Sequence, residues 1–357
     1  MSDQSGAREE RTHNLRRTTF LGASLMAAAL AFASSCSWTN PASADDLTTV
    51  TIGKAVDTLP YTVEDIGIAK GFFKKNGVNV KEILVQGSSV ASAAMVGGSL
   101  QFALEAAVPL MLARSHGVPL IAVDAIDNSV TLQFLASKQW LAKHPAPAAA
   151  TLKQKMADLN GSVLAQVGAT DPAFYALLRG WAGLPKQQGY RIESMDSQAG
   201  ATVAIQRGIV DVLVASPPHS VQLTQAGEAV DFVDRKDVPQ FNGVAYDLLT
   251  TTEDYAKKNP QIVTAVATAV AETLNFMREH PNQTLAIVQN HYPTLDKSVL
   301  QQSLQFIPIV KNGLQSQKDW DRAVALAQET GFVKGVKAAP EGVYWTNQYI
   351  DMSKLGK

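Results

Sequence analysis

The sequence predicts an α/β protein of two lobes, each a mostly parallel sheet flanked by helices, joined by a two-strand hinge. Its 357 residues are 46% hydrophobic and 18% charged, which is a soluble globular composition. A chain of this length commonly divides into more than one lobe. Beyond residue 46, short β-branched runs alternate with helical patterns, and this alternation favours parallel strands with helices on both faces.

The charge balance and the cysteine count exclude two classes of function. Lys and Arg number 31 and Asp and Glu number 32, so the formal net charge is −1. No basic surplus is available to neutralise a phosphate backbone, and we expect no nucleic-acid partner. The single cysteine, Cys36, cannot form an internal disulfide or a multi-cysteine metal site.

Residues 1–44 have the pattern of an export signal. Four arginines precede an apolar run at 20–33, and Ala42-Ser43-Ala44 matches a cleavage site. The run is shorter than the roughly 20 residues that a membrane-spanning helix needs. The leader therefore predicts a periplasmic protein with no membrane span after processing.

Two details of the leader leave alternatives open. The string RRTTFL resembles a twin-arginine signal with one extra residue after the arginine pair, so either export route is possible. Cys36 lies where a bacterial lipoprotein would be cut and acylated. Cleavage after Ala44 and a lipid anchor at Cys36 both remain open.

The first cycle of strands and helices occupies residues 50–123. Apolar runs predict strands at 50–56, 78–85, 100–104 and 120–123, and helical spacing predicts a helix over 63–73. A second helix begins near Ser88-Ser89 and stops at Gly97-Gly98.

A second cycle follows the Pro/Ala-rich connector at 144–150. Thr151 is placed to cap a short helix, and Asp171-Pro172 begins another, because Asp caps free amides and Pro fits the first turn. The run YRIES at 190–194 is followed by a helix over about 201–207 and by a strand that ends near Ala215. With Gly98 set against Gly208, the two cycles align, which favours two lobes of similar build; the alternative is a coincidence of common α/β patterns.

The last part of the chain returns to the first lobe. A strand is predicted over 241–251, and Asn259-Pro260 begins the longest helix, which stops at His280-Pro281. The helices that follow would pack back on the first lobe. The chain would then cross between lobes near 132–136 and 243–248. These crossings give the lobes as 45–131 with 243–357, and 132–242.

Three segments resemble a known family. They are IGIAKGFFKKNGVNVKEILVQGSSVASAAMVGGSLQFAL, DLNGSVLAQVGATDPAFYALLRGWAGL and QRGIVDVLVASPPHSVQLTQAG. Their order resembles that of periplasmic solute-binding proteins for nitrate, alkanesulfonates, taurine and the thiamine pyrimidine precursor. Gln101 replaces an acidic residue usual in that family, whereas Asp211 keeps it.

The resemblance implies a type II periplasmic-binding-protein-like fold and a role in an ABC-type importer. A small polar organic solute would be captured between the lobes and delivered to a membrane permease and its ATPase. The protein would be a monomer without a cofactor. A thiamine-pyrimidine-synthase-like enzyme and a periplasmic sensor are the alternatives on the same fold.

Candidate ligand-binding residues lie where strands end. In open α/β sheets, ligands bind outside the carboxyl ends of strands, where helix N-termini offer free amides. The family's contacts come from the corresponding loops. The candidates are Thr58, Tyr61, Gly87, Ser88, Ser89, Glu105, Gly168, Thr170, Asp171, Ser216, His219, Asn242 and Tyr246.

Several of these candidates have a structural alternative. Ser88 and Ser89 could cap a helix, and Asp171 is more readily explained as a cap than as a ligand partner. The two tyrosines could be packing residues, and His219 a surface loop residue. Glu105 follows an apolar strand in a loop with no other charge, and it is the least expected side chain there.

The charges near the site constrain the solute. The six loops contain no Lys or Arg, but they contain Glu105 and Asp171. A carboxylate ~4 Å from a bound anion costs about 1 to 4 kcal/mol, whereas a helix N-terminus returns about 0.3 to 1 kcal/mol. The balance favours a neutral or amine-bearing solute unless Lys54 or Arg179 reaches the site.

Enzyme signatures are lacking in the sequence. It contains no G-x-S-x-G, P-loop, G-x-G-x-x-G or H-E-x-x-H motif. The histidines beyond residue 44 have no metal-ligand spacing. We therefore expect a binding protein rather than an enzyme.

Overall fold

The computed structural model describes residues 47–85, 87–144, 150–168, 171–186, 189–233, 235–331 and 333–355. The predicted leader at 1–44, with its alternatives at Cys36, lies outside these residues. So do most of the predicted connector and the candidate Thr170. In the described part of the chain, no helix combines the length and apolarity needed to cross a membrane.

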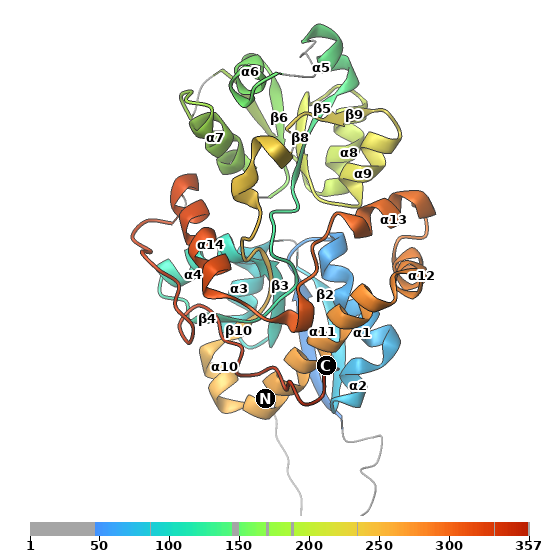
Figure 1. Cartoon of the computed structure of the whole chain (residues 1–357), viewed down its shortest axis with the longest axis vertical. Coiled ribbons are helices and arrows are strands. Elements are labelled where there is room, and N and C mark those ends of the chain that lie inside the picture. The colour runs from blue at the N-terminus through green and yellow to red at the C-terminus, as the bar shows by residue number, and fades with distance from the viewer. Residues whose placement is uncertain are drawn as a thin grey trace, which may run out of the picture. The chain divides into compact units, whose positions relative to one another are not determined.

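The first sheet has five strands in the order β2-β1-β3-β10-β4 (Figure 1). β1 is parallel to β2 and β3, whereas β10 runs antiparallel to β3 and β4. β10 comes late in the chain, so the return strand predicted after residue 241 inserts between two early strands. The bounds are β1 (Thr48–Lys54), β2 (Val78–Leu84), β3 (Phe102–Ala106), β4 (Leu120–Ala125) and β10 (Asp247–Thr252).

The second sheet repeats this arrangement in the order β7-β6-β8-β5-β9. β6 is parallel to β7 and β8, and β5 is the antiparallel strand between β8 and β9. β3 and β8, which the Gly98 and Gly208 alignment matched, are the third strand of each sheet. The predicted α/β class with two mostly parallel sheets is confirmed. The bounds are β5 (Gln133–Ser137), β6 (Val163–Gln166), β7 (Arg191–Ser194), β8 (Val212–Ala215) and β9 (Ala229–Asp231).

Helices accompany the strands of the first sheet. The longest, α11, begins after Asn259 at Pro260 and buries Val263, Val266 and Val270, as the helical spacing predicts. The short 3-10 helix η1 follows β1. The bounds are η1 (Leu59–Thr62), α1 (Val63–Lys70), α2 (Phe72–Lys75), α3 (Ser88–Val96), α4 (Ala107–Ser115), α10 (Glu253–Lys258), α11 (Pro260–Glu279), α12 (Pro281–His291), α13 (Lys297–Gln305) and α14 (Gln317–Thr330).

Two helices of the second sheet, α6 and α7, begin where the sequence predicts, and α8 begins before the predicted residue 201. Thr151 forms a capping box with Gln154 at the start of α6. α7 begins at Asp171, and Ser197 caps α8 by accepting a hydrogen bond from the amide of Gly200. The bounds are α5 (Lys138–Lys143), α6 (Leu152–Asp158), α7 (Asp171–Trp181), α8 (Gln198–Gln206) and α9 (His219–Gln225).

Two chain segments connect the sheets and pair with one another. Ser129 and Asn242 form an antiparallel bridge, and the amide of Val130 donates to the carbonyl of Phe241 at 3.0 Å. This pairing lies a few residues before the predicted crossings at 132–136 and 243–248. The predicted strand at 241–251 is correspondingly shorter, because residues 241–246 make the crossing and only Asp247–Thr252 joins the sheet.

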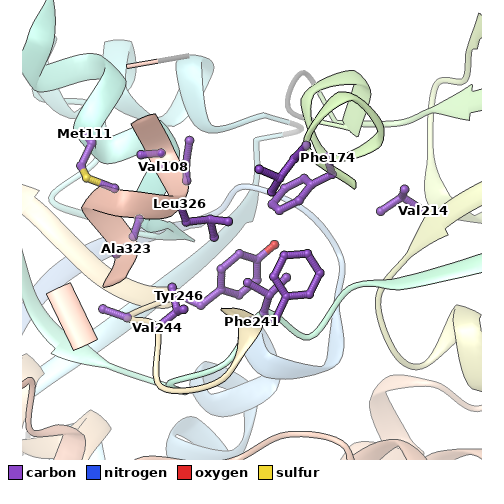
Figure 2. Packing of buried hydrophobic residues seen from close by; sticks show 14 of the residues in the cluster. Val108, Met111, Phe174, Val214, Phe241, Val244, Tyr246, Ala323 and Leu326 are labelled. Atoms are coloured by element: carbon purple, nitrogen blue, oxygen red, sulfur yellow. The ribbon is translucent and has the colours of Figure 1, made fainter. Parts of the chain in front are cut away.

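One apolar cluster continues around the crossing segments. Phe241 is fully buried and stacks on Phe134 of β5, with ring centroids 6.3 Å apart. It also meets Phe174 of α7 edge-on at 6.0 Å. Figure 2 shows Phe241 and Tyr246 between Phe174 and side chains of α4 and α14 such as Leu326. The crossing is therefore held by packing as well as by backbone hydrogen bonds.

Candidate functional site

A cavity of about 1140 Å³ is lined by residues from both sheets. On the first sheet, its wall includes residues that follow β1, β2 and β3. On the second sheet, it includes the ends of β6 and β7 and the residue after β8. All six strands meet the cavity at their carboxyl ends, where α/β sheets place their ligands.

Ten of the thirteen predicted residues line this cavity. They are Thr58, Tyr61, Gly87, Ser88, Ser89, Gly168, Asp171, Ser216, His219 and Tyr246. The Gly87-Ser88 turn of the first sheet and the loop that ends at Asp171 of the second therefore share one space. Thr170 lies outside the described residues, and Glu105 and Asn242 lie elsewhere.

The turn before α3 presents two serine hydroxyls. Gly87 has a φ of 138°, a region that L side chains rarely adopt, so the turn requires glycine. The Gly87 amide donates to the carbonyl of Ala55 at 2.6 Å, which holds the turn against the end of β1. α3 has no side-chain cap, so the capping alternative for Ser88 and Ser89 does not apply. Both hydroxyls line the cavity with no hydrogen-bond partner among the described residues.

Asp171 is the first residue of α7, and its carboxylate holds the preceding residues rather than capping the helix amides as the sequence predicted. Its Oδ2 accepts hydrogen bonds from the amides of Val167 at 2.8 Å and Gly168 at 2.9 Å. A Cβ on Gly168 would lie 3.0 Å from the Asp171 Oδ1, so the close approach needs glycine. Burial raises the pKa of Asp171 to about 6. The loop amides are taken by this carboxylate rather than left for a solute.

Tyr61 and Asp247 form a buried pair at the cavity wall. The Tyr61 hydroxyl donates to Asp247 Oδ1 at 2.9 Å, and both residues line the cavity. Desolvation raises the pKa of Asp247 to about 6. Asp127, from the first crossing segment, accepts the Asp247 amide at 3.2 Å. The sequence left open whether Tyr61 packs in the interior or lines the cavity, and in the structure it does both.

Asp57 is a lining residue that the sequence analysis missed. Its Oδ1 accepts the Tyr292 hydroxyl at 2.8 Å and lies 3.4 Å from His291 Nε2. The hydrogen bond from His291 holds the pKa of Asp57 below its ordinary value. The His291 Nδ1 lies 2.9 Å from Asp65, and the two carboxylates raise the pKa of His291 to about 9. An ionised carboxylate therefore faces the cavity.

His219 faces the same cavity from the start of α9. Desolvation lowers the pKa of its imidazole below the ordinary value. The ring is therefore mostly neutral at pH 7 and offers a hydrogen bond rather than a positive charge.

Glu105 and Asn242 do not face the cavity, which corrects two sequence-based placements. Glu105 is fully buried, and its Oε1 accepts the Thr250 hydroxyl of neighbouring β10 at 2.8 Å. Asn242 lies on the second crossing segment, where its carbonyl accepts from Arg322 at 2.9 Å. Glu105 belongs to β3 itself and not to the loop after it, whereas Asn242 belongs to a crossing segment and not to the end of a strand.

Neither basic residue considered from the sequence reaches the cavity. Lys54 is 3% exposed and donates to Asp65 at 2.5 Å and Glu82 at 2.7 Å. Arg179 is also buried and donates to two backbone carbonyls. Among the described lining residues there is no Lys or Arg, whereas four are aspartates: Asp57, Asp171, Asp196 and Asp247.

The start of α8 is a further part of the wall that the sequence analysis did not select. Ser197 and Gln198 line the cavity. In the Gly98 and Gly208 alignment they match Gly87 and Ser88. The internal repeat could therefore have predicted that Ser197 and Gln198 line the cavity. No group of His, Cys, Asp and Glu in the described residues is arranged to hold a metal ion.

Comparison with known proteins gives the family. The model of the family described as NMT1/THI5 like matches residues 65–284, and the chain belongs to this family. Among curated proteins, no sequence matches the chain. The resemblance inferred from the sequence is confirmed at the level of the family.

Solved structures share the fold at low sequence identity. A protein of Bordetella bronchiseptica RB50 has a TM-score of 0.73 and 20% identity, covering 85% of this chain and 96% of its own. The periplasmic aliphatic sulphonate binding protein SsuA from Escherichia coli has a TM-score of 0.61 and 16% identity, with 79% and 85% covered. The periplasmic nitrate-binding protein NrtA from Synechocystis PCC 6803 has a TM-score of 0.62 and 14% identity, with 82% and 83% covered.

Proposed function

We propose that this protein is the solute-binding component of an ABC-type importer. It would capture a small polar organic solute in the cavity and deliver it to an inner-membrane permease and its ATPase. The observation that carries the proposal is that one cavity is lined by strand ends of two equivalent sheets. Two of the structural relatives are, by their names, periplasmic binding proteins for sulphonate and for nitrate, which supports the same class of role.

The proposed mechanism is closure around the solute. Residues 45–131 with 243–357 would form one lobe and residues 132–242 the other, with the paired crossing segments as the hinge. A solute that contacts both lobes shifts the equilibrium towards the closed form by its preference for that form. The permease would then recognise the closed surface. The leader would place this cycle in the periplasm.

The cavity favours an uncharged or amine-bearing solute over a small anion. Asp57 is ionised, and no Lys or Arg lies among the described lining residues. An anion ~4 Å from such a carboxylate would lose about 1 to 4 kcal/mol. Hydroxyls of Ser88, Ser89 and Ser216 can donate to or accept from an uncharged polar group.

Native mass spectrometry of the protein taken from its own periplasm tests the proposal. We expect a retained solute of defined mass, together with the processed N-terminus. Isothermal titration calorimetry with a panel of amines, neutral polar molecules, nitrate and alkanesulfonates then tests the charge preference. Binding of the small anions alone would overturn the proposed solute class.

A further inference from the structure

The cavity has an apolar wall in addition to its polar strand ends. We infer that the solute carries a sizeable apolar part, aliphatic or aromatic, that lies against a wall formed by α3 and α4. This inference rests on the proposed function and specifies the chemistry of its solute. The wall consists of Val90, Ala93 and Val96 of α3 and of Pro109, Leu112 and Ala113 of α4.

The spacing of these residues places them on one face of each helix. Val90, Ala93 and Val96 follow one another at intervals of three, and Pro109, Leu112 and Ala113 at intervals of three and one. Such spacings form a single stripe along a helix. The two helices also pack against each other, so the two stripes make one continuous surface.

α3 is apolar on two faces, and the protein covers one of them. Ala91 and Met95 are buried in the core with Met111 of α4. The opposite face carries Val90 at 53% exposure and Val96 at 59%. The outward face of a surface helix normally carries charged or polar residues. α3 contains no charged residue, and its only polar residues are serines, so the exposed valines leave an apolar surface that an apolar group of a solute would cover.

The cavity supplies the reason to assign that contact to the solute. The exposed stripe and the polar residues Ser88, Asp57 and His219 line one and the same cavity. Its volume of about 1140 Å³ exceeds the roughly 300 to 1,000 Å³ typical of sites for drug-sized ligands. A solute of only a few atoms would leave the apolar wall in water. A solute with a polar end and an apolar body covers both regions.

Two homologous series of probes test this inference on the purified protein. Linear primary amines and linear primary alcohols, each from ethyl to hexyl, are titrated by calorimetry. Burial of each added methylene predicts about fourfold tighter binding. Val90→Ser and Val96→Ser should reduce this gain per methylene. Val203→Ser is the control, because Val203 is an exposed valine of α8 that does not line the cavity.

The outcomes separate this inference from the proposed function. Affinity that does not change with chain length, or a gain unaffected by Val90→Ser and Val96→Ser, overturns the apolar wall and leaves the binding role intact. If Val203→Ser reduces the gain per methylene as much as the two cavity variants do, the apolar wall is overturned as well. If no probe binds and the periplasmic protein retains no solute, the proposed function itself fails, and the inference fails with it.

Discussion

The backbone amide of Leu59 donates a 3.0 Å hydrogen bond to the carbonyl of Pro217. Leu59 follows β1 of the first sheet, and Pro217 follows β8 of the second. Their neighbours Thr58 and Ser216 both line the cavity. The bond therefore brings a strand end of each sheet to one place, where a bound solute is within reach of both.

Serine hydroxyls from both sheets should contribute to solute binding. Ser88→Ala and Ser216→Ala each remove one hydroxyl from the cavity wall, and each should weaken binding of the retained solute by about 0.5 to 1.5 kcal/mol. Calorimetry measures the change. Ser353→Ala is the control, because its hydroxyl is bonded to Asp351 and lies outside the cavity lining. Loss of affinity in only one of the two cavity variants would contradict binding by both sheets.

Lys54 should support stability rather than bind solute. Its ammonium is buried between Asp65 and Glu82. Lys54→Met leaves Glu82 without its partner and Asp65 with His291 alone, and it should cost about 3 kcal/mol, the lower end for a broken buried pair. Urea unfolding measures this change. Lys258→Met is the matched control, because Lys258 and Asp254 form an exposed pair worth about 0.3 to 0.5 kcal/mol. Equal effects of the two substitutions would refute the assignment.

The carboxylate of Asp171 should hold the loop before α7. Asp171→Ala leaves the amides of Val167 and Gly168 without an acceptor, which should cost about 1 to 3 kcal/mol of unfolding free energy. Asp171→Asn retains one acceptor oxygen and should cost less. Chemical unfolding of both variants tests the order. If the Ala variant is as stable as the parent protein, the two hydrogen bonds have no stabilising role.

The His291 network should make stability depend on pH above neutrality. Asp57 and Asp65 raise the pKa of His291 to about 9 in the folded protein, from about 6.5 in the unfolded chain. The stabilisation is therefore complete below pH ~6.5 and is lost as the pH rises towards 9. Allowing for solvent screening of the half-buried ring, we expect a loss of about 1 kcal/mol. In His291→Gln, the unfolding curves measured at pH 6 and at pH 9 should converge. If the variant loses as much stability between these pH values as the parent protein does, the His291 network is not the cause of the pH dependence.

Solute binding should close the two lobes. X-ray scattering should give a smaller radius of gyration with the retained solute than without it, because the hinge moves as the solute contacts both sheets. Identical profiles in the two states would count against hinge closure while leaving the location of the site unchanged.

Much of the fold could be predicted because local signals agreed with the final packing. Asn259-Pro260 begins α11 and Asp171-Pro172 begins α7, where the cap chemistry predicts. The match between Gly98 and Gly208 anticipated that β3 and β8 take the same place in their sheets. These features depend on a few neighbouring residues, which a sequence displays directly.

The parts of the site that were missed depend on long-range contacts. Glu105 turns to Thr250 of β10, which lies 145 residues later in the chain. Both faces of the sheet are covered, so alternation alone does not show which side chains meet the cavity. Asp57 lines the cavity, and its charge is stabilised by His291, the last residue of α12, and by Tyr292, which follows it. No local pattern reveals either partner.

A crystal structure of the protein with the solute that it retains from the periplasm decides where and how binding occurs. We predict that the solute lies in the shared cavity, within hydrogen-bond distance of Ser88 or Ser89 from the first sheet and of Ser216 or His219 from the second. A solute held by residues of one sheet alone, or bound outside this cavity, would contradict the binding mode proposed for this protein.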